Sequence, residues 1–188
     1  MRTSRVEDAE LAALAQAGDR EAFGELLARH ATQVRRVCRA VLRDPADADD
    51  AAQDGFLAAL RNLGRYDPAR PFGPWLMKIV ANAAIDRTRR QKVRRAEHLP
   101  EALASEAAGP DTEAERAALR HALADALDQL PERQRLAVVL FDVEGYTHRE
   151  IAEILRMPVG TVRSEVFHAR RKLREAMAPW KGLQEEAQ

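Results

Sequence analysis

Residues 146–177, YTHREIAEILRMPVGTVRSEVFHARRKLREAM, decide the fold that the sequence predicts. Thr147 is followed three residues later by Glu150, which is the spacing of a capping box and predicts the start of a helix. Pro158 is poorly tolerated inside a helix but suits the start of a new one. The stretch therefore predicts a short helix, a tight break and a second helix, which is the plan of a helix-turn-helix.

The second of these helices has two different faces at helical spacing. The apolar stripe consists of Val162, Val166, Ala169, Leu173 and Met177. The opposite face and its flank carry Arg163, Ser164, Phe167, His168, Arg170, Arg171 and Arg174. Arg and Ser can address base edges, an apolar ring can meet a thymine methyl, and flanking arginines can hold phosphates. This pattern favours a helix that reads the major groove of DNA over an amphipathic helix with a solvated basic face.

Composition indicates an all-α protein with segregated charge. The 188 residues have a formal net charge of zero, yet residues 86–95 are strongly basic and residues 97–115 are acidic. Cys38 is the single cysteine, which excludes an intramolecular disulfide and fits a cytoplasmic chain. No segment has the pattern of a signal peptide or of a membrane span. Strand signals are scarce, whereas helical spacing of apolar residues recurs throughout.

The order of these patterns predicts two small helical domains joined by a linker. We expect an N-terminal tail at 1–9, a first domain at 10–95, an acidic linker at 96–111, a second domain at 112–178 and a tail at 179–188. The expected core includes Leu11 and Leu14, then Leu60, then Val143. His30 and Cys38 lie on or beside the core stripe of a long helix, where packing is a better explanation than a metal pair or a nucleophile.

An acidic face begins the third expected helix, which runs from about residue 47 to residue 63. Its acids and amide are Asp47, Asp49, Asp50, Gln53 and Asp54. One or two carboxylates would satisfy the helix N-terminus, so the surplus suggests a docking face for a basic partner. Gly55 is costly inside a helix and predicts close approach by another backbone.

The loop at 64–74 and the helix after it combine aromatic and basic side chains. The loop contains Tyr66 and Arg70, and Lys78, Asn82 and Arg89 line one flank of the next helix. Aromatic rings beside a basic groove are typical of a surface that binds single-stranded nucleic acid. A structured but inert connection is the alternative for the loop.

These residues resemble a bacterial sigma factor of the extracytoplasmic-function type, which belongs to the sigma-70 family. The resemblance covers nearly the whole chain in two blocks. The first block comprises residues 48–56, Trp75, Leu76, Asn82, Asp86, Arg89 and Arg90. The second comprises residues 130–135, 150–152 and 160–164 with Ala169 and Arg170. Two independent blocks in the same order make the resemblance specific.

The resemblance implies a non-enzymatic initiation factor that needs no cofactor or metal. Core RNA polymerase would bind through its clamp helices to Asp50, Gln53 and Asp54, and through its β flap to the second domain. The −10 element would be opened and read by Tyr66, Arg70, Lys78, Asn82, Arg87, Arg89 and Arg90. The −35 element would be read by Arg163, Ser164, Phe167, His168, Arg170 and Arg171. The acidic linker would occupy the polymerase cleft, and an anti-sigma factor would hold the protein inactive.

Two other classes of protein remain open at this point. A sigma-like decoy would bind an anti-sigma factor without driving transcription, but it would need no DNA-reading face. A stand-alone helix-turn-helix repressor would have no use for the acidic face and linker. The chain also departs from the family pattern at Glu165 and His168, where the family commonly has Arg. This departure leaves the exact −35 sequence undetermined.

Overall fold

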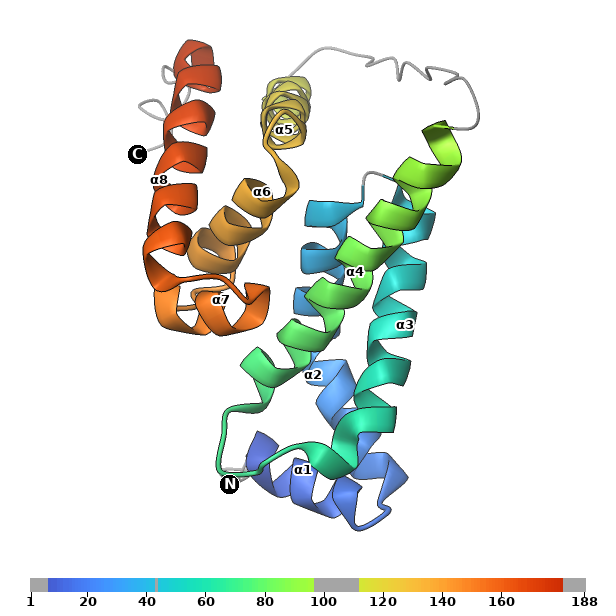
Figure 1. The fold of residues 1–188 in the computed structure, drawn as a ribbon. Helices are drawn as coiled ribbons and strands as arrows, with labels where there is room; N and C mark the ends of the chain where they lie inside the picture. The colour runs from blue at the N-terminus through green and yellow to red at the C-terminus, as the bar shows by residue number, and fades with distance from the viewer. Residues whose placement is uncertain (1–6, 43, 97–111, 181–188) are drawn as a thin grey trace.

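The computed structural model describes residues 7–42, 44–96 and 112–180. These residues form eight α-helices, joined in places by short 3₁₀ and π turns, and contain no strand, which confirms the all-α prediction (Figure 1). The first four helices are α1 (Asp8–Gln16), α2 (Arg20–Val41), α3 (Pro45–Asn62) and α4 (Phe72–Ala96). The other four are α5 (Thr112–Asp128), α6 (Glu132–Val138), α7 (His148–Leu155) and α8 (Val159–Ala176). The predicted linker, most of the N-terminal tail and the end of the C-terminal tail lie outside the described residues.

Helix ends follow the capping signals of the sequence. Asp19 accepts backbone hydrogen bonds from Glu21 and Ala22 at the start of α2, and Asp44 caps α3. Thr147 and Glu150 form both hydrogen bonds of the predicted capping box at the start of α7. Each cap satisfies backbone donors that the helix cannot satisfy itself, so the side chains define where these helices begin.

The first four helices pack around a core of buried aliphatic residues. The buried centre includes Leu26, Val34, Val37, Leu76, Met77 and Val80. Helix α3 lies directly against α4, because a Cβ at Gly55 would be only 2.9 Å from Val80 Cγ2 and 3.4 Å from Val80 Cα. The predicted close approach at Gly55 is therefore confirmed. The predictions for Leu14 and Leu60 were wrong, since both side chains are exposed by about half.

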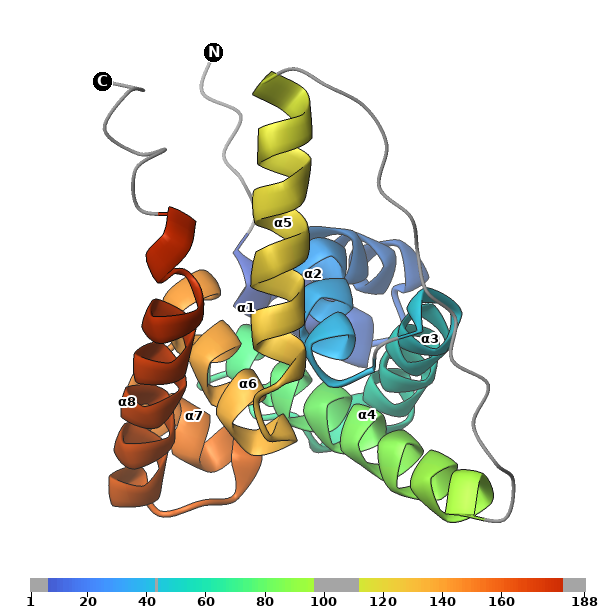
Figure 2. The same ribbon diagram turned by 90° about the horizontal axis from the view of Figure 1, so that it is seen from above.

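Helices α6, α7 and α8 form the second domain, and α5 contacts α8 (Figures 1 and 2). Its core contains Leu136, Leu140, Ile151, Ile154, Val162 and Val166. Val143 was expected in this core but is 55% exposed: the chain after α6 widens into a π turn, in which the Glu144 N–H donates to the Val139 oxygen, and Gly145 follows with φ +74°. The apolar face of α7 meets Val162 and Val166 of the α8 stripe at the core, as a helix-turn-helix requires.

The two domains pack directly against each other. Helix α4 contacts α7, and α2 contacts α6. Arg36 of α2 forms a two-pronged ion pair with Glu144, with distances of 2.7 Å and 3.2 Å, and the Tyr146 hydroxyl donates to Gln33. The first view shows α7 beside the lower part of α4 (Figure 1). Across the described ranges, the structure contains no helix that is long and apolar enough to span a membrane.

Candidate nucleic-acid and docking surfaces

The outer face of α8 presents most of the predicted −35 residues to solvent. Arg163, Ser164 and Arg171 are exposed, and Phe167 is the most exposed large apolar side chain described, at 64%. His168 is half-buried, and its ring contacts the Phe167 ring with a centroid distance of 5.5 Å. Val162, Val166 and Ala169 face the core on the other side. A bare aromatic ring among Arg, Ser and His side chains fits contact with base edges.

Arg170 differs from the other predicted residues of this helix. Its Nε lies 2.9 Å from Asp142 Oδ2, and its guanidinium carbon lies 4.9 Å from the centre of the Phe141 ring. The hydrogen bonds to Asp142 raise the pKa of Arg170 above its ordinary value. These contacts turn the side chain toward the segment after α6. The structure therefore gives Arg170 a role in fastening α8 to its own domain.

The turn before α8 is set by backbone geometry and a proline. Arg156 is the one described non-glycine residue with a positive φ, at +53°, and Pro158 takes the cap position of α8. A left-handed residue at this point ends α7, and Pro158 starts the next helix without losing a needed donor. No sequence signal marks Arg156 for this role, because glycine is the usual residue there.

The acidic face of α3 carries Asp50, Gln53 and Asp54, and all three are exposed. Arg87, predicted to contact the −10 element, points to this face instead. Its Nη2 lies 2.7 Å from Asp50 Oδ2 and 3.0 Å from Asp47 Oδ1, and its Nη1 lies 3.5 Å from Asp54 Oδ2. Hydrogen bonds to Asp47 and Asp50 raise the pKa of Arg87 despite partial desolvation. The structure thus joins Arg87 to the docking residues.

Tyr66 was predicted to contact single-stranded DNA, but the structure buries it. The side chain is 4% exposed, its hydroxyl donates to the backbone oxygen of Arg70, and its ring packs against Phe72 and Trp75. Burial raises the pKa of the Tyr66 hydroxyl. In this conformation the ring shapes the loop between α3 and α4 and offers no face on which a base could stack.

Asn82 and Arg89 of α4 come together at a cavity between the two domains. The cavity has a volume of about 440 Å³, and its other walls include Arg133 and Arg156 of the second domain. Asn82 is half-buried and donates to the backbone oxygen of Lys78 one turn earlier. The predicted −10 residues Lys78, Asn82 and Arg89 therefore lie along one helix. In this arrangement the second domain lies across the cavity from Asn82 and Arg89.

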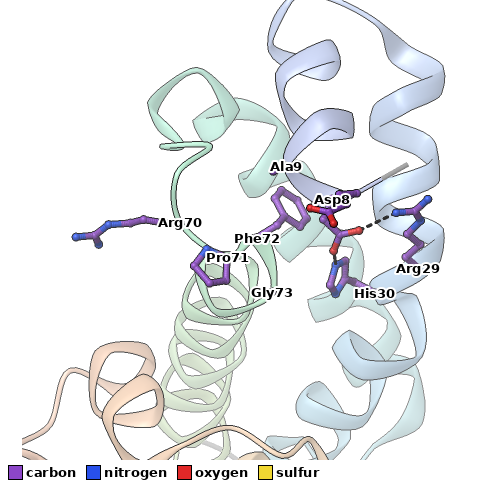
Figure 3. Close-up of a pocket in the computed structure, with 9 residues that line it drawn as sticks. Asp8, Ala9, Arg29, His30, Arg70, Pro71, Phe72 and Gly73 are labelled. Atoms are coloured by element: carbon purple, nitrogen blue, oxygen red, sulfur yellow. Dashed lines mark hydrogen bonds and ion pairs between the residues drawn. The ribbon is translucent and has the colours of Figure 1, made fainter. Parts of the chain in front are cut away.

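Arg70 lies at the edge of a second cavity, of about 590 Å³, beside the loop (Figure 3). Figure 3 shows Arg70 directed away from the cluster of Asp8, Arg29 and His30 on the other side. His30 Nε2 lies 2.7 Å from Asp8 Oδ2, and Arg29 Nη1 lies 2.9 Å from Asp8 Oδ1. Burial of Asp8 would raise its pKa, but hydrogen bonds from Arg29 and His30 outweigh burial and lower it. This cluster could not be predicted from local sequence, because Asp8 belongs to α1, whereas Arg29 and His30 belong to α2.

Cys38 and His30 have structural roles, as expected. Cys38 is fully buried, and burial raises the pKa of its thiol to about 12. His30 bridges Asp8 and Gln33, and thereby ties α1 to α2. Within the described ranges, no group of His, Cys, Asp or Glu side chains is arranged to hold a metal ion.

Comparisons with known proteins identify two matching segments. Residues 26–94 match Sigma-70 region 2, and residues 120–173 match Sigma-70, region 4. The first segment contains the acidic face and most of α4, and the second contains α7 and most of α8. The two surfaces described above therefore fall one in each matched segment.

Relatives of known name match over most of their length. The chain is 42% identical over 170 residues to the ECF RNA polymerase sigma factor SigM of Mycobacterium tuberculosis, covering 88% of this chain and 82% of SigM. It is 39% identical over 160 residues to the RNA polymerase sigma factor CarQ of Myxococcus xanthus, covering 85% of this chain and 91% of CarQ. The solved structure of CnrH in complex with the cytosolic domain of CnrY has 31% identity and a TM-score of 0.68, covering 92% of this chain and 97% of CnrH.

Proposed function

This chain belongs to the sigma-70 family as a sigma factor of the extracytoplasmic-function group, and we propose that it recruits core RNA polymerase and reads its promoter through two separate faces. A sigma factor has no catalytic activity of its own and lends promoter specificity to the polymerase. Residues 10–95 would act as one domain and residues 112–178 as the other. Because a sigma factor acts on RNA polymerase and promoter DNA, we propose that this protein is located in the cytoplasm.

The docking face on α3 carries the polymerase interaction in this proposal. Asp50, Gln53 and Asp54 form an exposed polar stripe at positions i, i+3 and i+4 of one helix, which fits a basic partner. We propose that the clamp helices of the polymerase bind there, while the β flap binds the second domain. The exposure of two carboxylates beside an amide supports this assignment.

The promoter contacts divide between the domains. We propose that α8 enters the major groove at −35 with Arg163, Ser164, Phe167, His168 and Arg171. Its exposed Phe167 is the observation that carries this proposal, because a large apolar side chain that is 64% exposed lies outside the core of the fold. At −10 we propose Arg70, Lys78, Asn82, Arg89 and Arg90, which lie on α4 and the loop before it.

We also propose that a protein partner of the anti-sigma type regulates this factor. The resemblance to extracytoplasmic-function sigma factors implies such a partner. The similar CnrH was solved in complex with the cytosolic domain of CnrY, which supports regulation by a bound protein.

Co-elution with core polymerase tests the docking face. The double variant Asp50→Arg with Gln53→Ala should abolish co-elution, because it places a positive charge where a basic partner binds. Asp49→Ala is the matched control, since Asp49 is an exposed acid of the same helix whose charge acts on the buried Cys38. Retained co-elution by a folded double variant would remove this face from the proposal. Failure of the unmodified protein to bind polymerase would favour a decoy.

A further inference from the structure

Arg87 is an arginine of α4 whose described ion pairs are with carboxylates of α3. Its three partners, Asp47, Asp50 and Asp54, follow the i, i+3, i+7 spacing of one helix face, beside which α4 runs (Figure 1). Asp47 is the inner partner, with 29% of its side chain exposed. Asp50 and Asp54 are 60% and 64% exposed. One guanidinium thus links an inner carboxylate to the two outer carboxylates of the docking face.

Charge repulsion explains why this face needs a cation. Like charges three or four residues apart on a helix destabilise one another. Among the residues whose side chains the structure describes, Arg87 is the cation within ion-pair distance of these three acids. A guanidinium offers several donors in a fixed fork, so one side chain can serve more than one carboxylate.

The outer carboxylates keep acceptor capacity while Arg87 holds them. The contacts with Asp50 and Asp54 each use the Oδ2 atom, at 2.7 Å and 3.5 Å from Arg87. The remaining oxygen of each carboxylate is available to a partner, because a carboxylate has about four acceptor sites. The face as a whole stays negative, since one arginine offsets only one of three acids.

We propose that Arg87 is a positioning residue of the polymerase-docking surface: it holds Asp50 and Asp54 in the orientation that a basic partner binds, and it does not contact promoter DNA. The inference rests on the proposed function of the α3 face. Side chains that are ordered before binding lose less entropy when the partner arrives, which strengthens the complex. Removing Arg87 should therefore weaken polymerase binding, even though Arg87 carries the same positive charge as the basic partner.

Arg90 provides the contrast on the same helix. It lies three residues after Arg87, is exposed, and makes no ion pair with any described residue. Its guanidinium is available for a DNA phosphate, whereas that of Arg87 is occupied by acids. The two arginines should therefore affect two different steps of initiation.

The experiment measures two properties of full-length Arg87→Ala, Arg87→Lys and Arg90→Ala. One is the Kd for core polymerase at several salt concentrations, and the other is promoter opening at saturating factor. Arg87→Ala should bind polymerase about fivefold more weakly and open the promoter normally once bound. Arg87→Lys should be intermediate, because an ammonium group lacks the fork that spans several carboxylates. Arg90→Ala should bind polymerase normally and open the promoter less.

A double-mutant cycle separates positioning from a general effect on folding. In an Asp50→Asn, Asp54→Asn background, the loss caused by Arg87→Ala should shrink, because the acids that it positions are neutral. An equal loss in both backgrounds, or normal polymerase binding with impaired opening, would overturn the proposal. If the unmodified protein does not bind polymerase, the proposed function fails first, and that result is distinguishable from a failure of Arg87 alone.

Discussion

Gly55 shows how a single residue sets the distance between two helices. Replacement by Ala would place a methyl group 2.9 Å from Val80 Cγ2, and Val80 is fully buried and cannot move aside. Overpacking of this kind costs about 1–3 kcal/mol, which exceeds the gain of about 1 kcal/mol in helix propensity. We therefore expect Gly55→Ala to lower the free energy of unfolding, measured by urea denaturation.

Gly24 is the matched control for this prediction. It lies inside α2 and is exposed, and a Cβ there would meet no atom within 4 Å. Gly24→Ala should therefore raise the free energy of unfolding, by up to about 1 kcal/mol. Equal effects of the two substitutions would show that helix propensity, and not the contact with Val80, governs position 55.

Residue type alone could not show whether Tyr66, Arg87 and Arg170 contact nucleic acid or another part of the protein. A tyrosine or arginine beside a basic segment is equally compatible with nucleic-acid contact and with an internal partner. The partners that decide the matter are Phe72 and Trp75 for Tyr66, and acids of neighbouring helices for the two arginines. Gly55 was predictable because glycine inside a helix is costly and therefore indicates a packing constraint.

At the scale of elements, local signals predicted the helix-turn-helix well. The capping box at Thr147 and the start of α8 after Pro158 are confirmed, and the apolar stripe of α8 is confirmed at Val162, Val166 and Ala169. These features depend on residues within two turns of each other, so the sequence contains them in full. The left-handed conformation of Arg156 was not predictable, because the packing of α7 on α8 imposes it and no glycine marks it.

The exposed face of α8 leads to a prediction about promoter recognition. If the Arg171 guanidinium contacts a guanine, Arg171→Ala should weaken binding to the −35 element by roughly 1–3 kcal/mol. Transcription that depends on the −35 element should fall accordingly. The fold should be unaffected, because Arg171 is exposed and its described ion pair, with Glu175 at 3.9 Å, is a weak surface contact. Run-off assays on promoters with substituted −35 positions would measure this loss.

Lys172 offers a control on the same helix. It is exposed, but its amino group is directed to Gln134 of α6, at 3.4 Å. Lys172→Ala should leave the −35 preference unchanged. Unaltered −35-dependent transcription by Arg171→Ala would exclude Arg171 from the reading face and leave that role to Phe167 and its neighbours.

At the scale of the whole molecule, the packed arrangement cannot read both promoter elements together. The −35 and −10 elements lie about 25 base pairs apart, or about 85 Å of duplex. A compact chain of this length has a radius of gyration of about 16 Å. The two domains must therefore separate on promoter DNA, and the contacts of Arg36 with Glu144 and of Tyr146 with Gln33 must break.

The ion pair between Arg36 and Glu144 should favour the packed arrangement. Only 3% of the Glu144 side chain is exposed, so loss of its partner would leave a buried carboxylate unpaired. We expect Arg36→Glu to increase the radius of gyration in small-angle X-ray scattering. The charge-swapped pair, Arg36→Glu with Glu144→Arg, should restore the compact value.

Arg35→Glu is the control, because Arg35 is exposed beside Arg36 and makes no described ion pair. An unchanged radius of gyration in Arg36→Glu would show that apolar contacts alone hold the domains together. The sequence could not predict this pairing, since Arg36 and Glu144 are 108 residues apart and no local pattern links them.

Run-off transcription tests the central claim most directly. Core RNA polymerase and this protein would be combined with a library of double-stranded promoter fragments, and the transcripts would be sequenced. The account predicts transcripts whose templates share two upstream motifs at a fixed spacing, one near −35 and one near −10. An absence of such transcripts, with the same polymerase shown to be active with another sigma factor, would contradict the claim that this protein directs transcription initiation.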